Sequence, residues 1–148
     1  MEHLSSVHDR LSAVIVTTPQ AVALHDAMKS LSFTREVKLP VLGIVENMSG
    51  YICPCCGEIS NVFSTGGGEE MARREGVPFL GALPVDTELV SLLDAAKIAP
   101  KEGSQLPEKR GFGLARRYQE TPSGKLFKRV LDTLLDTLLA TERRISPN

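Results

Sequence analysis

Three short stretches are rich in apolar residues and predict buried strands, and the third is broken by a glycine. The stretches are residues 13–18, 41–45 and 77–83, and the first two consist largely of β-branched side chains. Runs of this kind are typical of parallel strands that are covered on both faces. A periodic segment from Pro19 to about Lys38 separates the first two runs, so a right-handed β-α-β unit is predicted.

Helix signals follow each of the later runs. Residues 69–75 predict a short helix that ends at Gly76, and Asp86 can cap a helix that extends to about Lys97. These elements together give at least three parallel strands with covering helices, which is an α/β fold.

The clearest helix signal lies over residues 125–144, with Ser123 as the expected N-cap. Apolar residues recur there every four positions along two neighbouring stripes. One stripe contains Leu126, Val130, Leu134 and Leu138, and the other contains Phe127, Leu131, Leu135 and Leu139. We expect this helix to dock on the sheet, and binding to a partner is the less favoured alternative.

Two stretches lack either pattern. Residues 46–68 are rich in Gly, Ser, Asn and Cys and predict a long irregular loop, and loops of this length are often functional. Residues 98–124 carry several prolines and glycines, and they predict a flexible surface insertion. The length of the chain suits one domain.

Composition narrows the class of protein. The chain has 148 residues, of which 42% are hydrophobic, and 17 basic side chains against 18 acidic ones give a net charge of −1. This balance argues against a strongly basic nucleic-acid-binding protein. No apolar run approaches the length of a membrane span, and the first residues do not form a secretory signal. We therefore expect neither nucleic acid nor a membrane among the partners.

Candidate chemistry is concentrated in three cysteines within four residues, Cys53, Cys55 and Cys56. An odd, clustered set cannot form a disulfide framework and indicates thiols that are kept reduced. Cys53 and Cys56 form a C-x-x-C motif, in which Pro54 and Gly57 favour a tight turn that brings two sulfurs together. Thiolates arranged in this way bind zinc or iron–sulfur clusters.

The motif alone leaves three interpretations open. A thioredoxin-type redox pair is the least favoured, because no apolar helix follows the cysteines. Half of a zinc ribbon and half of a bridging iron–sulfur site are equally favoured, and both need four ligands. One chain offers only three thiols, so the simplest arrangement takes two cysteines from each of two chains and predicts a dimer.

The glycines do not form a phosphate-binding loop. Residues 66–68 are three glycines before a helix, but no Lys-Ser/Thr pair follows them, so they predict a flexible turn. The Gly124-Lys125 pair also fails, because Leu126 follows the lysine. We do not expect this chain alone to cradle a nucleoside triphosphate.

Five ordered motifs resemble those of the Mrp/Nbp-type P-loop ATPases, the MinD-related scaffolds for iron–sulfur clusters. The motifs occupy residues 14–20, 43–50, 53–56, 63–69 and 77–86. The resemblance is closest to the Cfd branch, the smaller partner of the cytosolic scaffold. It implies an α/β fold that forms the C-terminal half of a doubly wound, mostly parallel P-loop NTPase sheet with flanking helices.

The same resemblance implies a function. Cys53 and Cys56 would ligate a [4Fe-4S] cluster that bridges a homodimer, or a heterodimer with a related scaffold ATPase, and that is passed to apo iron–sulfur proteins in the cytoplasm. Asn47 would recognise the adenine base of ATP. No role is implied for Cys55. Two alternatives stay open: a structural zinc-binding dimerisation module, and a nucleotide-binding fragment that works only with a complete partner subunit.

In that family a phosphate-binding loop with a signature lysine precedes all five motifs, and residues 2–4 resemble the sequence just after the second acidic switch motif. We therefore expect no ATPase activity from this chain alone and assign no catalytic residue. Without the strands that carry the loop, the sheet is predicted to have an open edge, which favours association and low stability.

Overall fold

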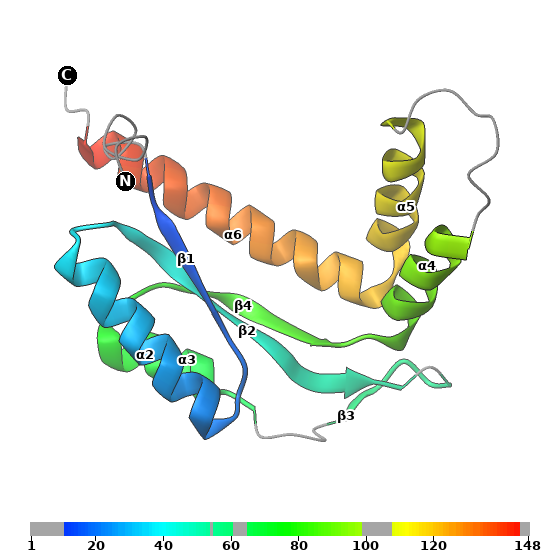
Figure 1. Cartoon of the computed structure of the whole chain (residues 1–148), viewed down its shortest axis with the longest axis horizontal. Helices are drawn as coiled ribbons and strands as arrows, with labels where there is room; N and C mark the ends of the chain where they lie inside the picture. Colours follow the sequence, from blue (N-terminus) through cyan, green and yellow to red (C-terminus); the bar gives the residue numbers. More distant parts are fainter. Residues whose placement is uncertain (1–10, 54, 61–64, 99–107, 146–148) are drawn as a thin grey trace.

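A four-stranded sheet forms the centre of the structure, and helices lie on both of its faces (Figure 1). The computed structural model describes residues 11–53, 55–60, 65–98 and 108–145. The elements are β1 (Ala13–Thr17), α2 (Ala21–Glu36), β2 (Val41–Ile52), β3 (Ile59–Ser60), α3 (Gly67–Glu75), β4 (Phe79–Val85), α4 (Thr87–Ile98), α5 (Glu108–Glu120) and α6 (Pro122–Ile145).

The long strand β2 organises the sheet. It pairs in parallel with β1 on one side and with β4 on the other, and its last two residues pair with the short antiparallel strand β3. The predicted β-α-β unit and the three parallel strands are therefore confirmed. None of the helices in the described residues combines the length and the apolar character needed to cross a bilayer.

Two hydrophobic clusters hold the layers together, one on each face of the sheet. Ile44 is fully buried in the cluster beneath α2 and α3, and its neighbour Val45 is buried in the cluster beneath α6. Successive side chains of a strand point to opposite faces, so β2 contributes to both clusters. From α6, Val130 and Leu134 pack on the sheet, as the docking prediction requires. The second predicted stripe stays largely exposed: Phe127, Leu131, Leu135 and Leu139.

The predicted burial of β1 on both faces is wrong. Ile15 and Thr17 are buried, whereas Val14 is 37% exposed and Val16 is 61% exposed. The apolar run indicates a strand correctly, but it cannot tell whether a helix lies over each face. In the described residues, α6 covers β2 and β4 and leaves the same face of β1 open (Figure 1).

Two regions predicted to be irregular contain regular structure. The loop expected from residue 46 begins only after Ile52, because β2 continues to that residue. The predicted flexible insertion at 98–124 includes the helix α5, whose Tyr118 ring contacts the Phe127 ring of α6 at a centroid distance of 6.3 Å. Packing on α6 thus stabilises a segment whose glycines weaken the local helix signal. Residues 99–107 lie outside the described residues.

The helix caps at one end of the sheet form a small polar network. Asp86 caps α4 as predicted, because its Oδ1 accepts the Glu88 backbone N–H at 2.8 Å. The cap of α6 is Thr121 and not Ser123: the Thr121 hydroxyl accepts the Gly124 N–H at 3.0 Å. Pro122 occupies the first helical position, which suits proline. Ser123 instead donates its buried hydroxyl to the Asp86 carboxyl group.

An ion pair that links α2 to α3 predicts a pH-dependent stability. Arg35 donates to the Glu75 carboxyl group at 2.9 Å, and this bond, supported by Arg74, holds the pKa of Glu75 below its ordinary value. A lowered carboxyl pKa stabilises the fold above the unfolded-state pKa, and the gain is lost as pH falls through the folded-state value. We expect Glu75→Gln to lower the urea midpoint at pH 7, with a difference that shrinks as the pH falls below the ordinary glutamate pKa and through the lowered value of the folded protein.

The matched control for this test is Glu36→Gln, at an exposed carboxyl group near the end of α2. It should leave the urea midpoint unchanged at both pH values. An effect of Glu75→Gln that is equally large at pH 7 and at low pH would show that packing, and not the charge pair, is responsible.

Candidate functional site

The C-x-x-C motif lies at the tip of the β2–β3 hairpin. The Cys53 backbone N–H donates to the Glu58 carbonyl at 2.9 Å, and the Gly57 N–H donates to the Cys53 carbonyl at 2.8 Å. Gly57 has φ of 72°, in the left-handed region that glycine adopts without strain. Cys53 is half-buried, and Cys55 and Cys56 are exposed. The hairpin therefore presents the cysteines at the surface on a closed turn.

The turn favours the thiolate form of Cys53. Backbone N–H groups of Cys56 and Cys55 hydrogen-bond its sulfur and lower the pKa of the Cys53 thiol, and partial burial opposes this shift more weakly. Hydrogen bonds to the charged form always favour that form. A thiolate is the form that binds metal, so the backbone prepares Cys53 as a ligand.

The hairpin supplies only part of a metal site. Within the part of the chain that the structure describes, no group of three or more His, Cys, Asp and Glu side chains converges to hold a metal ion. The cysteines also lie at a hairpin tip, not at the helix N-terminus that activates a thioredoxin-type pair. Any cluster or zinc ion held here would need further ligands from outside these residues.

Asn47 lines a cavity of about 390 Å³. This cavity lies between the ends of β2 and β4 and the helices α4, α5 and α6. The Asn47 Oδ1 accepts the Met48 backbone N–H at 2.9 Å, which fixes the orientation of the amide. Tyr118 and Phe127 add aromatic rings to the lining. An oriented amide beside aromatic rings is an arrangement that suits a planar base.

The backbone around Asn47 departs from regular strand geometry. Met48 has φ of 57° and Gly50 has φ of 88°, and the pairing of β2 with β4 is interrupted between Asn47 and Tyr51. A non-glycine residue with positive φ is uncommon and is often found at functional sites. The irregular stretch includes Asn47 and Met48, which line the cavity, and leads along β2 to the cysteine hairpin.

Glu46 is a residue of the site that the sequence analysis missed. Its side chain is only 1% exposed, and its carboxyl oxygens accept the Gly66 N–H at 3.0 Å, the Gly68 N–H at 2.6 Å and the Ser49 hydroxyl at 2.6 Å. The one available signal was an acidic residue directly after a buried apolar run. Glu46 ties the start of α3 to the end of β2.

The prediction of a flexible turn at residues 66–68 is therefore wrong. These glycines begin α3, and two of their N–H groups are bound to Glu46. A Cβ atom on Gly68 would lie 3.1 Å from Glu46 Oε2 and 3.2 Å from the Thr17 methyl group. Gly68 thus permits the close approach of α3 to the sheet, so its role is structural.

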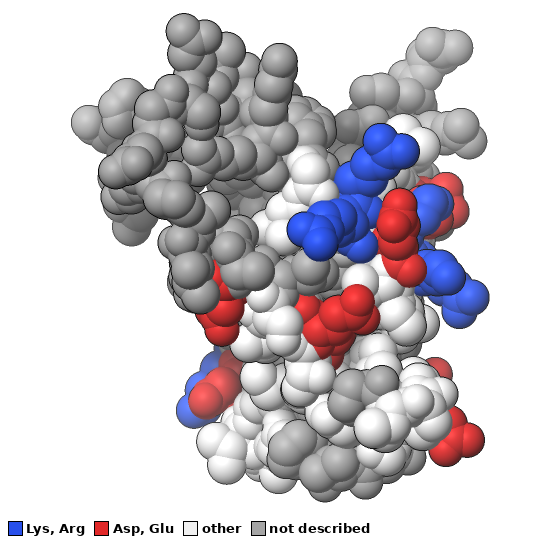
Figure 2. Space-filling view, turned by 90° about the vertical axis from the view of Figure 1, so that its right-hand side faces the viewer, with Lys and Arg blue, Asp and Glu red and all other residues white. Residues whose placement is uncertain are grey.

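All of these groups lie at the carboxyl ends of parallel strands, where α/β sheets bind ligands. Asp86 lines the Asn47 cavity and also a cavity of about 460 Å³ that contains Cys53 and Gly57. The candidate base site and the cysteine hairpin are therefore neighbours. Figure 2, which views this end of the molecule, shows acidic and basic side chains interspersed on its described part, without a broad area of one sign.

Residues 2–114 match the model of a protein family described as ParA, NUBPL iron-transfer P-loop NTPase. The chain belongs to this family. It is 54% identical to the cytosolic Fe-S cluster assembly factor NUBP2 of Bos taurus over 98 residues, which are 63% of this chain and 36% of that protein. It is 44% identical to the cytosolic Fe-S cluster assembly factor CFD1 of Yarrowia lipolytica over 131 residues, 88% of this chain and 40% of that protein.

Among solved structures, the chain is similar to a nucleotide-binding protein from Archaeoglobus fulgidus in complex with ADP. The TM-score is 0.50 and the identity 36%, over 62% of this chain and 38% of that chain. The predicted α/β fold with a P-loop NTPase sheet is confirmed by this likeness and by the family. The chain spans less than half the length of these relatives.

Proposed function

We propose that this chain acts in cytosolic iron–sulfur cluster assembly, as its relatives' names indicate for them. In this proposal Cys53 and Cys56 hold one side of a [4Fe-4S] cluster that bridges two subunits and is delivered to apo iron–sulfur proteins. The second subunit is another copy or a related scaffold ATPase. The cluster is cargo, and the chain's residues bind and expose it.

The cysteine hairpin is the observation that carries this proposal. Two thiols on a closed turn, with backbone N–H groups directed at the Cys53 sulfur, suit thiolate ligation. Among the described residues, no group of three or more possible ligands converges at the hairpin, which favours a site shared between chains. The exposure of Cys56 leaves the cargo accessible to an acceptor protein.

Transfer of the cluster to an acceptor protein distinguishes the proposed function from that of a structural zinc module, which would use the same two thiols but transfer nothing. The chain is reconstituted without oxygen, freed of unbound iron and mixed with an apo-ferredoxin in the presence of an iron chelator. We expect the acceptor's charge-transfer absorbance to appear despite the chelator. Zinc bound without acid-labile sulfide, and no transfer, would favour the structural module.

We also propose that Asn47 recognises the adenine base of ATP or ADP, since the similar protein from Archaeoglobus fulgidus is in complex with ADP and the Asn47 cavity has aromatic walls. An asparagine amide can bond two edge atoms of adenine. Asn47→Ala should weaken binding of a fluorescent ADP analogue by about 10- to 100-fold. The measurement uses this chain together with the phosphate-binding part of a relative, because its own 148 residues contain no phosphate loop.

The control for that test is Gln119→Ala, an exposed amide side chain on α5 that is not among the described residues lining the Asn47 cavity. It should bind the analogue as the wild type does. Equal loss in both variants, or preference for a guanine analogue that survives Asn47→Ala, would refute the assignment of Asn47.

A further inference from the structure

The buried carboxyl group of Glu46 binds the chain on both sides of the cysteine hairpin. Its Oε1 accepts the Ser49 hydroxyl at 2.6 Å, and Ser49 precedes the cysteines in the sequence. The same oxygen accepts the N–H of Gly66, which follows the cysteines, at 3.0 Å, and Oε2 accepts the Gly68 N–H at 2.6 Å. One oxygen atom therefore joins the two ends of the segment that carries the hairpin.

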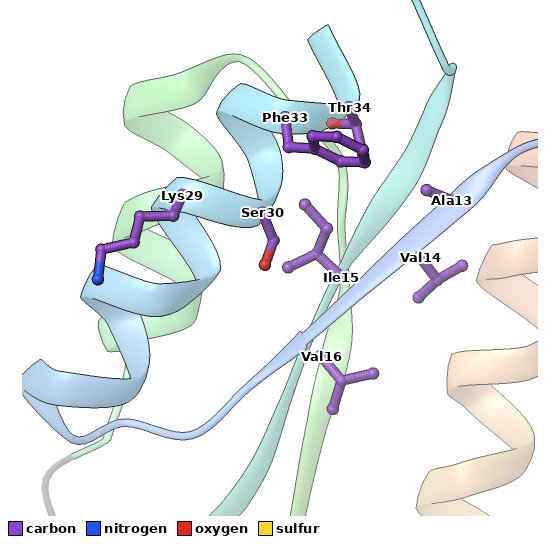
Figure 3. Close-up of a pocket in the computed structure, with 8 residues that line it drawn as sticks. All are labelled: Ala13, Val14, Ile15, Val16, Lys29, Ser30, Phe33 and Thr34. Carbon is purple, nitrogen blue, oxygen red and sulfur yellow. The ribbon is translucent and has the colours of Figure 1, made fainter. Parts of the chain in front are cut away.

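These bonds differ from the side-chain bonds on the neighbouring part of the sheet, which are local. In the groove between β1 and α2, Ser30 and Thr34 both lie on α2 (Figure 3), and their hydroxyls donate to carbonyls of the same helix at 3.1 and 2.8 Å. Glu46 instead bonds glycines 20 and 22 positions away, with only 1% of the residue exposed. Buried bonds between distant segments fix the position of one segment relative to the other.

The hairpin has little packing of its own. Ile52, at the end of β2, supplies a buried side chain, but β3 is two residues long and both of its residues are exposed. The turn is closed by backbone hydrogen bonds from the Cys53 and Gly57 N–H groups. A two-stranded hairpin is marginally stable without further packing. The position of the hairpin therefore depends on how its root is held.

The root of the hairpin also contains an unfavourable backbone conformation. Met48 has φ of 57° and lies between Glu46 and Ser49, which the side-chain hydrogen bond joins. A positive φ at a residue other than glycine persists only where the surrounding structure determines it. Without the bond between Ser49 and Glu46, this stretch could relax, and the strand that leads to Cys53 would change direction.

We propose that Glu46 is a positioning residue for the cysteine hairpin. By holding Ser49 and Gly66 on one oxygen, it fixes the direction in which the hairpin leaves the sheet, and thus where the cysteines meet a second subunit. This inference deepens the proposed cluster function and rests on it for that last step. Groups that orient metal ligands without touching the metal commonly change metal affinity by about 10- to 100-fold when they are removed.

Ser49→Ala tests the proposal, because it removes the bond at one end of the hairpin and leaves both glycine bonds of Glu46 in place. Hydrogen exchange is followed by NMR on the metal-free, reduced protein. We expect the Cys53 and Gly57 amides, which are bonded in the turn, to exchange about three- to tenfold faster. The Ile44 amide in the buried part of β2 should keep its rate, which a general loss of stability would not allow.

The second readout is the loss of iron from the reconstituted protein to a chelator, which Ser49→Ala should speed about tenfold. Ser60→Ala is the matched control, since it removes a hydroxyl group from an exposed position of the same hairpin. It should leave both readouts unchanged. Glu46→Gln keeps one acceptor oxygen and should speed exchange of the hairpin amides at least as much as Ser49→Ala does.

Hairpin amides that exchange at the wild-type rate in both Ser49→Ala and Glu46→Gln would overturn the proposal. Equal acceleration at Ile44 in Ser49→Ala would also overturn it, because the network would then support only the fold in general. Iron loss at the wild-type rate despite faster hairpin exchange would do the same. Faster hairpin exchange in a protein whose wild type retains no iron would support the positioning role and refute the cluster proposal, so the two failures are distinguishable.

Discussion

Cys53→Ala or Cys56→Ala should reduce the iron and acid-labile sulfide retained after reconstitution by at least about tenfold. Each change removes one of the two thiolates that the hairpin offers, so the bridging site keeps two ligands in a homodimer or three in a heterodimer, and neither set holds the cluster stably. Cys53→Ala should have the larger effect, because its sulfur is the one that the backbone N–H groups of Cys55 and Cys56 contact.

Cys55→Ala is the matched control in the same turn. Its side chain is exposed, and its backbone N–H to Cys53 survives the substitution. We expect this variant to retain nearly all of the iron and sulfide of the wild type. Equal retention in all three variants would contradict the assignment of Cys53 and Cys56, and loss in all three would make Cys55 a ligand as well.

Glu46→Ala should lower the free energy of unfolding by about 2–4 kcal/mol. The substitution leaves the N–H groups of Gly66 and Gly68 and the hydroxyl of Ser49 without their acceptor in a buried site. Buried donors without partners are costly, and the start of α3 would separate from the end of β2. The measurement is urea unfolding followed by circular dichroism.

Two variants calibrate this result. Glu46→Gln keeps one acceptor oxygen and should lose part of the stability, since an amide nitrogen cannot accept the second glycine N–H. Glu36→Ala, at an exposed carboxyl group, should change stability by less than about 0.5 kcal/mol. A Glu46→Ala protein as stable as Glu36→Ala would show that Glu46 does not hold the helix.

The central sheet was predictable from local patterns. The apolar runs at 13–18, 41–45 and 77–83 each overlap a strand, and the apolar composition that identifies them is a short-range property. The cysteine turn was also readable, because Gly57 and the C-x-x-C spacing act within six residues. The same holds for the Asp86 cap, which bonds a backbone N–H two residues away.

The errors arose where distant parts of the chain decide the structure. Helix α5 depends on packing between Tyr118 and Phe127. The fixed conformation of the three glycines depends on hydrogen bonds to Glu46, which lies 20 residues before Gly66. Ser123 has the right chemistry for a cap, but Asp86 binds it and Thr121 takes its place. The exposed face of β1 depends on which helices are present, and no pattern within the strand records that.

The most direct test of the account is the cluster content of the chain together with its native mass, after reconstitution without oxygen. We predict iron and acid-labile sulfide equivalent to roughly one cluster for every two chains, in a species with the mass of a dimer or of a heterodimer with a related scaffold. Zinc without sulfide, or a full cluster on a monomer, would contradict the proposal that two hairpins share one cluster.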